Sequence, residues 1–170
     1  QFEGWEEVFS AYYPSAYTAY QYNGGIYGLP ETHNYNVMFY REDIMKDLEL
    51  EIPQTWDDVI ALLPTIQGNN LEVGLPTTAS TTAPDLSAFY TFLYQMGGDV
   101  YDEEGKKTTI NQEEGVKAFD LYTSFFNDYG LPKEYDFISR FRSGQMPIAI
   151  VSYTMFNTLV VSAPEIKGLW

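Results

Sequence analysis

The side chains that most often carry out covalent chemistry are scarce in this sequence. Cysteine is absent, which excludes thiol nucleophiles and zinc sites built on thiolates. His33 is the single histidine, so a Ser-His-Asp mechanism would have to run through that residue. The acidic run Asp102–Glu104 lacks the alternating oxygen ligands and the glycine of a calcium loop, and is interpreted as a solvated turn. The sequence therefore favours binding over catalysis and predicts neither a metal nor a cofactor.

A stretch of small polar residues between a predicted strand and a predicted helix offers hydrogen-bonding groups. Residues 73–76 predict the strand, and Pro84 suits the first position of the helix. In open α/β sheets, ligands lie outside the carboxyl ends of strands, and the start of a helix supplies free N–H donors. Thr78, Ser80 and Asp85 are therefore candidate ligand contacts. The alternative is a plain loop in which Asp85 only complements the helix dipole.

The predicted elements that position these residues alternate along the chain. Runs typical of strands occupy residues 35–40, 73–76 and 147–151, and the first of them is expected to be buried on both faces. Helical patterns lie between and after these strands, at residues 42–48, 55–66, 84–96, 111–129, 136–142 and 155–162. This alternation predicts an α/β domain in which helices are layered around a mainly parallel sheet.

Local signals add detail to this scheme. Asn23-Gly24-Gly25 predicts a hairpin turn, and Thr55–Asp58 predicts a capping box at a helix start. Pro64 predicts a kink or a break in that helix, and Asn111 is expected to cap the helix that follows it. The buried face of the helix predicted at residues 111–129 is indicated by apolar residues at helical spacing: Val116, Phe119, Tyr122, Phe126 and Tyr129.

Composition narrows the choice of partners. The 170 residues include 24 acidic and 9 basic ones, a net charge of −15, and this field repels phosphate backbones, so nucleic acid is not an expected partner. Solubility alone also explains such a charge. No run approaches the roughly 20 apolar residues of a membrane helix. Because the chain starts at Gln1 and ends within the apolar segment 166–170, we expect a piece of a longer, processed protein.

The order of five stretches resembles the family 1 extracellular solute-binding proteins, relatives of the maltose-binding protein. Each stretch is weak alone, but all five occur in the family's order across residues 20–155. The stretches are residues 22–30, residues 37–43 with 52–58, residues 97–101, residues 109–111 leading into the 114–129 helix, and residues 141–150.

The resemblance implies a fold and a function. Proteins of this family have two α/β lobes joined by crossing segments, and the lobes close on a ligand in the cleft between them. Residues 1–29 are then expected to form an edge of the first lobe and a crossing segment, and residues 30–170 an incomplete second lobe of the type II periplasmic-binding-protein kind. The implied function is capture of a small extracellular solute, with a carbohydrate expected, for an ABC importer.

The resemblance also implies ligand contacts. Sugar hydroxyls bind planar polar groups, and the C–H faces of a sugar ring pack on flat aromatic surfaces. Asn34 and then Glu31 are the expected polar contacts from the crossing region, although a solvated hinge charge equally explains Glu31. Tyr153, beside Thr154 after the strongest strand, is the expected stacking platform. Phe156 is a second aromatic candidate, for which core packing is the favoured explanation.

Two other conspicuous residues are interpreted as structural. His33 is expected to be an exposed or hinge residue, and Trp56 is expected to pack against the strand layer and not against a ligand. The implied partners are the membrane subunits of an ABC permease, and the implied location is extracellular, either anchored to the cell surface as a lipoprotein or periplasmic. A carbohydrate hydrolase, with two facing carboxylates, and a surface sensory or interaction module are the alternatives.

Overall fold

The computed structural model describes residues 3–31, 34–76 and 86–170. Thr78, Ser80 and Asp85, three of the predicted contacts, lie outside the described residues, as does His33. The chain divides into two compact units, Gln1–Tyr35 and Asn36–Trp170. Within the described ranges, no helix combines the length and the apolar character that a bilayer span requires.

The first unit is a small aromatic cluster followed by a hairpin. Its elements are α1 (Trp5–Ser10), α2 (Pro14–Tyr17), the 3₁₀ turn η1 (Thr18–Tyr20), β1 (Gln21–Tyr22) and β2 (Gly25–Ile26). Phe9 is buried and meets the ring of Tyr17 edge-on, with the centroids 5.1 Å apart. Asn23 and Gly24 both have positive φ, 47° and 73°, which is typical of the tight turns that join antiparallel strands. The predicted hairpin is therefore confirmed.

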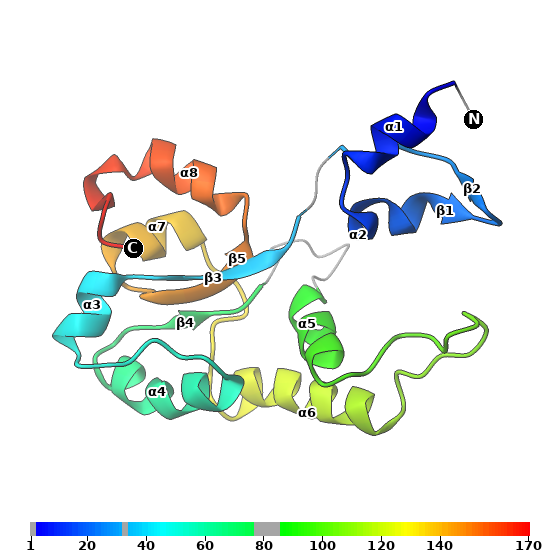
Figure 1. Ribbon diagram of the computed structural model, residues 1–170. Coiled ribbons are helices and arrows are strands. Elements are labelled where there is room, and N and C mark those ends of the chain that lie inside the picture. Colours follow the sequence, from blue (N-terminus) through cyan, green and yellow to red (C-terminus); the bar gives the residue numbers. More distant parts are fainter. Residues whose placement is uncertain (1–2, 32–33, 77–85) are drawn as a thin grey trace. The chain divides into compact units, whose positions relative to one another are not determined.

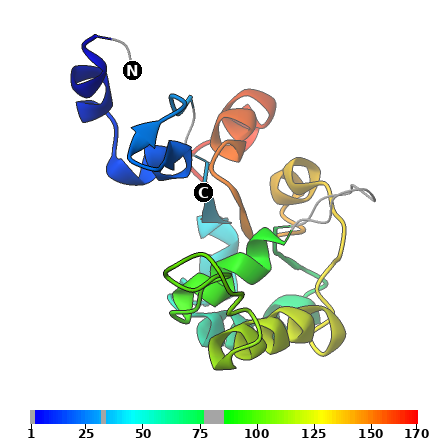
Figure 2. The same ribbon diagram turned by 90° about the vertical axis from the view of Figure 1, so that its right-hand side faces the viewer.

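The second unit has helices on both faces of a three-stranded sheet (Figure 1). Figure 2 shows the same layers from the side, with α7 and α8 on one face of the sheet and α4 and α6 on the other. Its elements are β3 (Asn36–Tyr40), α3 (Glu42–Asp47), α4 (Trp56–Gly68), β4 (Val73–Gly74), α5 (Ser87–Gln95), α6 (Glu113–Asn127), α7 (Phe137–Ser143), β5 (Ile148–Ser152), α8 (Met155–Ser162) and η2 (Pro164–Ile166).

The sheet is mixed, which corrects the expectation of a mainly parallel one. Its order is β3-β5-β4, where β5 pairs with β3 antiparallel over five residues and with β4 parallel over two. Strand β3 forms one edge of this sheet, and Phe39 is its only buried residue, so the expectation of a strand buried on both faces was wrong. The predicted α/β class, with strands and helices in the predicted order, is confirmed.

Each face of the sheet carries its own hydrophobic core. The core on the α4, α5 and α6 side includes Leu63, Phe92, Phe125 and Ile148, which are all fully buried. The core on the α7 and α8 side is built from a different set: Phe39, Phe137, Phe141, Met146, Ala149, Val151, Leu159, Ala163 and Ile166. Residues of β5 alternate between the two cores, which explains why the first four residues of this strand are buried.

Helix α6 packs on the core through part of the predicted face and through residues that were not predicted. Tyr122, Phe126 and Tyr129 pack against the core as predicted, whereas Val116 and Phe119 are half exposed, at 50% and 56%. The buried residues Gly115, Ala118 and Phe125 were not predicted. A Cβ at position 115 would overlap the carbonyl of Ile110, so the glycine lets the helix start lie close to the preceding turn.

Helix starts were predicted with mixed success. The capping box at α4 is confirmed, because Thr55 accepts from the Asp58 amide at 3.1 Å and the Asp58 carboxylate accepts from the Thr55 amide at 2.9 Å. Pro64 does not break the helix, which continues to Gly68. Asn111 is not the cap of α6, since the capping position is Gln112 and its side chain makes no capping hydrogen bond.

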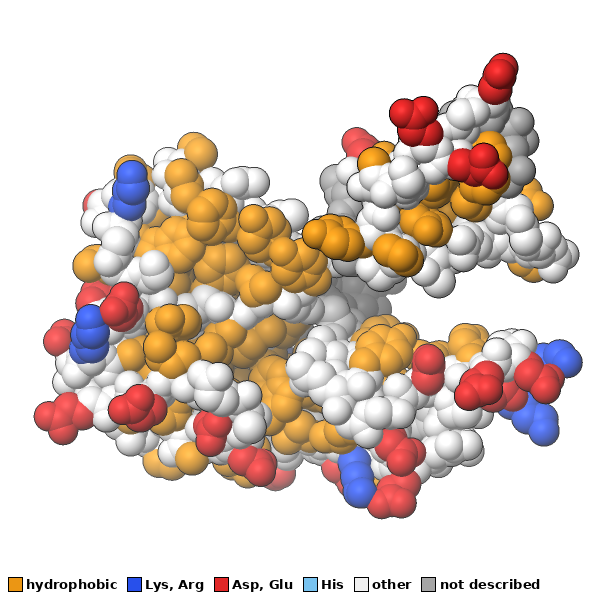
Figure 3. Space-filling model, viewed as in Figure 1, with side chains coloured by type: hydrophobic (Ala, Val, Ile, Leu, Met, Phe, Trp, Pro, Cys, Tyr) orange, Lys and Arg blue, Asp and Glu red, His pale blue; other side chains and the backbone are white. Residues whose placement is uncertain are grey.

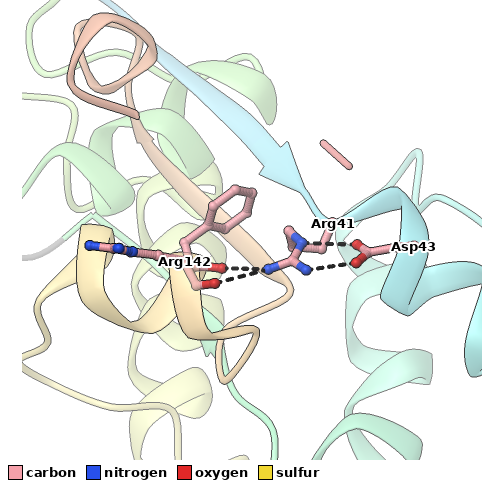
Figure 4. Close-up of polar contacts among 4 residues, drawn as sticks. Arg41, Asp43 and Arg142 are labelled. Atoms are coloured by element: carbon pink, nitrogen blue, oxygen red, sulfur yellow. Dashed lines mark hydrogen bonds and ion pairs between the residues drawn. The ribbon is translucent and has the colours of Figure 1, made fainter. Parts of the chain in front are cut away.

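Arg41 is a buried charged residue that joins the end of β3 to the end of α7 (Figure 4). Its guanidinium donates to both oxygens of Asp43, from Nε at 2.9 Å and from Nη2 at 2.6 Å. Nη1 donates to the carbonyls of Phe141 at 2.9 Å and Arg142 at 3.3 Å. These carbonyls belong to the last turn of α7, where helical partners are missing. Arg41 therefore satisfies a helix end while its own charge is neutralised.

Replacing Arg41 by methionine is expected to destabilise the fold by about 2–4 kcal/mol, because a carboxylate and two helix-end carbonyls lose their partner. Chemical denaturation measures this change. Lys46→Met is the matched control, since Lys46 forms an exposed ion pair with Glu42 and its loss should be too small to resolve. Equal effects of the two substitutions would contradict the structural role given to Arg41.

The same ion pair predicts a dependence of stability on pH. Hydrogen bonds from Arg41, and then its charge, hold the pKa of the Asp43 carboxyl below its ordinary value of 3.8. Because the folded-state pKa is the lower one, this stabilisation is complete above the unfolded pKa and is lost as the pH falls through the folded pKa. Urea unfolding at about pH 5 and about pH 3 should show a smaller acid-induced loss for Asp43→Asn than for the wild type.

Candidate functional site

The start of β3 and the end of β5 lie side by side at one end of the second unit's sheet. Asn36, the first residue of β3, pairs with Ser152, the last residue of β5. Strand β4 runs parallel to β5 and its carboxyl end points the same way, but β4 ends at Gly74 beside Ala149, three residues before the end of β5. We call the end of the sheet formed by Asn36, Ser152 and Tyr153 the binding edge.

Tyr153 and Phe156 form an exposed pair of aromatic rings at the binding edge. The rings are nearly parallel, at 11°, with their centroids 6.2 Å apart, and their exposed fractions are 44% and 42%. Phe156 also meets Trp170 edge-on at 5.6 Å, and Trp170 contacts the buried rings of Phe39 and Phe141. The favoured interpretation of Phe156 as a core residue was therefore wrong, because 42% of its surface is exposed even though its ring contacts Trp170.

The ring pair belongs to a wider apolar surface of the second unit. Figure 3 shows hydrophobic side chains gathered on the face that α8 and the C-terminal residues occupy in Figure 1. Exposed apolar residues in these segments are Tyr153, Phe156, Val160, Val161 and Leu169. Tyr153 carries both an aromatic ring and a phenolic hydroxyl. It can therefore contact the apolar face of a ligand and also hydrogen-bond to a polar group of the same ligand.

Two hydroxyl groups flank Tyr153. The Oγ of Ser152 lies 2.6 Å from the Oγ1 of Thr154, and the Thr154 amide donates to the Ser152 Oγ at 3.2 Å. These contacts fix the turn from β5 into α8 and keep both hydroxyls beside the exposed ring. Thr154 was predicted at this place, whereas Ser152 was missed. The sequence could have indicated Ser152, because it is the polar residue that ends a strand of otherwise apolar residues.

An uncharged groove opens beside the start of β3. Its volume is about 410 Å³, and it is lined by Asn36, Val37, Met38, Pro53, Gln54, Thr55, Trp56, Val59, Thr91, Gln95 and Ile150. Trp56 packs edge-on against Phe92 at 4.6 Å and donates from Nε1 to the Gln95 side chain at 2.6 Å. Its packing against the protein agrees with the prediction, although its ring partners come from helices and not from the strand layer.

The remaining predicted contacts are not brought together with Tyr153 by the described residues. Glu31 and Asn34 are exposed and belong to the first unit. Asn34 precedes the first residue of β3 by two positions, so chain connectivity ties it to the binding edge. The roles of Glu31 and Asn34 as ligand contacts remain predictions.

Several carboxylates of the second unit have structural partners. Every carboxyl whose pKa is shifted in the described part of the chain is shifted downward: Asp43, Asp58, Glu113, Asp136 and Glu165. Backbone hydrogen bonds at helix starts are the main cause for Asp58 and Asp136. Among the described residues, no group of three or more acidic or histidine side chains is arranged to hold a metal ion.

Solved structures show where this architecture recurs. An ABC-transporter solute-binding protein of Thermotoga lettingae, bound with alpha-D-tagatose, matches 96% of this chain and 46% of its own, with a TM-score of 0.77 and 23% identity. The maltose-bound MalE3 of T. maritima matches 98% of this chain and 44% of its own, also with a TM-score of 0.77, at 21% identity. The fold is thus that of a type II periplasmic-binding-protein lobe, as predicted.

Sequence comparison leads from this class to a family. The family model of bacterial extracellular solute-binding proteins matches residues 2–162, and the chain belongs to this family. An arabinooligosaccharide-binding protein of Halalkalibacterium halodurans is 28% identical over 112 residues, which are 64% of this chain and 24% of that protein. The chain spans less than half the length of these relatives.

Proposed function

We propose that this protein is the substrate-binding component of an ABC importer and captures a small neutral carbohydrate. One observation carries the proposal. The rings of Tyr153 and Phe156 are stacked and exposed where β5 leads into α8. A flat apolar surface of this kind accepts the C–H face of a sugar ring. The names of the relatives, which bind arabino-oligosaccharide, tagatose or maltose, support the same ligand class.

The polar groups around the ring pair suit hydroxyl groups and not a charged ligand. Ser152 and Thr154 supply hydroxyls that both donate and accept, and Asn36 lies opposite Ser152 in the sheet. The described residues that line the neighbouring groove carry amide, hydroxyl and apolar side chains and no charge. A neutral polyhydroxylated ligand can exchange its hydrogen bonds with water for hydrogen bonds to such groups without desolvating a protein charge.

The proposed binding mode uses two lobes. Residues 1–29 belong to the edge of the first lobe and a crossing segment, and residues 30–170 to the second lobe. Asn34 and Glu31 reach the ligand from the crossing region, and Thr78, Ser80 and Asp85 reach it from the segment that follows β4. Closure of the lobes then expels water, and hydrogen bonds strengthen in the drier cleft.

The proposed protein binds and releases its ligand without changing it. Its partners are the membrane subunits of an ABC permease, and its place is outside the cytoplasmic membrane, on the cell surface or in the periplasm. The family of extracellular binding proteins supports this location. The relatives named as an oligosaccharide-binding protein and a solute-binding protein support a role without catalysis.

A ligand screen tests the proposal. The full-length protein is heated with arabino-oligosaccharides, maltose and D-tagatose in separate samples, and the ligand that binds should raise the unfolding temperature because it binds only the folded state. Chromatography of the same mixtures should recover the carbohydrate unchanged. Release of shorter sugars would favour a hydrolase, and the absence of any thermal shift across these carbohydrates would count against the ligand class.

Tyr153→Ala tests the site within the full-length protein. We expect the carbohydrate that binds the wild type to bind at least about 1 kcal/mol more weakly, because the stacking surface is lost. Isothermal titration calorimetry measures the difference. Tyr101→Ala is the matched control, since Tyr101 is an exposed tyrosine, at 56%, outside the binding edge. An affinity unchanged by Tyr153→Ala would remove Tyr153 from the site.

A further inference from the structure

The ring of Phe156 receives little support from its own helix. Helix α8 begins at Met155, directly before Phe156, and Leu159 is the buried residue of this helix. A partly exposed ring on the first turn of a helix has more than one rotamer within reach. Whether the ring of Phe156 stays parallel to that of Tyr153 therefore depends on what packs against it from the protein side.

Trp170 packs against Phe156 from that side. The two rings meet edge-on, with their centroids 5.6 Å apart and an angle of 69° between their planes. The same indole contacts two buried rings of the core under α7 and α8, Phe141 edge-on at 6.2 Å and Phe39 at 5.8 Å. Aromatic contacts of this kind are favourable and have a preferred geometry. Trp170 therefore connects buried rings of β3 and α7 to the exposed pair.

The segment that carries Trp170 is fixed through its backbone. The carbonyl of Leu169 accepts from the amide of Glu42, the first residue of α3, at 2.8 Å, and the Leu169 amide donates to the Ile166 carbonyl at 3.1 Å. Among the described residues, the buried Nε1 of Trp170 has no hydrogen-bond partner. Ring packing, and not a hydrogen bond from the indole, therefore sets where this side chain lies.

We propose that Trp170 is a positioning residue for the carbohydrate-binding ring pair. It holds Phe156 parallel to Tyr153 and so keeps the two rings together as one surface. The inference rests on the proposed function, since it assigns Trp170 a role in the same site. Trp170 acts through Phe156 and does not itself contact the ligand. Its loss thus weakens binding although both rings of the pair are still present, because more conformational freedom is lost when the ligand binds.

Phe137 provides a matched control for Trp170. Its ring packs on the same two core residues, Phe39 at 5.6 Å and Phe141 at 5.1 Å. In the described part of the chain, Phe156 has Tyr153 and Trp170 as its ring partners and not Phe137. Trp170→Leu and Phe137→Leu therefore both remove ring contacts from this core, and only Trp170→Leu also removes the support of Phe156.

The variants are made in the full-length protein, and affinity is measured by calorimetry with whichever of maltose, arabino-oligosaccharides or D-tagatose binds the wild type. We expect Trp170→Leu to bind about two- to tenfold more weakly, the effect of one lost aromatic contact. Phe137→Leu should lower the unfolding midpoint and leave the affinity unchanged. Trp170→Phe keeps an aromatic ring and loses no hydrogen bond, so it should bind more tightly than Trp170→Leu.

A double-mutant cycle shows whether Trp170 acts through Phe156. In a Phe156→Ala background, Trp170→Leu should cause little further loss of affinity, because the ring that it supports is gone. An unchanged affinity of Trp170→Leu, an equal loss in Phe137→Leu, or a full additional loss in the Phe156→Ala background would overturn the positioning role. Wild-type protein that binds none of the three carbohydrates would instead overturn the proposed function, which separates the two failures.

Discussion

The pairing of β3 with β5 is the constraint on which the rest of the second unit depends. Strand β5 lies in the centre of the sheet, and its side chains alternate between two cores, so each face can receive its own layer of helices. A shift of this pairing by one residue would send each side chain of β5 to the opposite core. The same register sets Ser152 opposite Asn36 and thereby determines which residues share the binding edge.

The aromatic surface of the binding edge is anchored from below by packing. Phe156, which stacks with Tyr153, contacts Trp170, and Trp170 in turn contacts buried rings of the core under α7 and α8. Arg41 secures the end of α7, from which the chain continues into β5. Side chains that are already packed in this way lose less conformational freedom when a ligand binds, and this favours affinity.

Local features of the fold were predictable because they depend on neighbouring residues. The turn at Asn23-Gly24 and the capping box at Thr55 are encoded within a few positions, and both were found. The direction of β5 relative to β3 depends on contacts across more than one hundred positions, and no local pattern reports it. Part of the contact face of α6 was missed because Gly115 allows a close approach that hydrophobicity does not reveal.

The candidate site shows the same division. Tyr153 and Thr154 were predicted from a family likeness, and they lie at an exposed strand end, while their role as ligand contacts stays a prediction. Phe156 was assigned to the core because an apolar residue in a short helix has that as its commonest environment. Instead it stacks on Tyr153 and remains partly exposed, through a contact between a strand end and the first turn of the next helix. Ser152 was missed because strand residues were treated as structural support alone.

The central position of β5 also sets the order in which this unit can assemble. Both β3 and β4 have β5 as their neighbour in the sheet, yet β5 is the last of the three strands along the chain. During synthesis from the amino terminus, β3 and β4 therefore remain unpaired, with their apolar side chains exposed, until residues 148–152 have been made. Truncation before Ile148 would leave neither β3 nor β4 with its partner in the sheet.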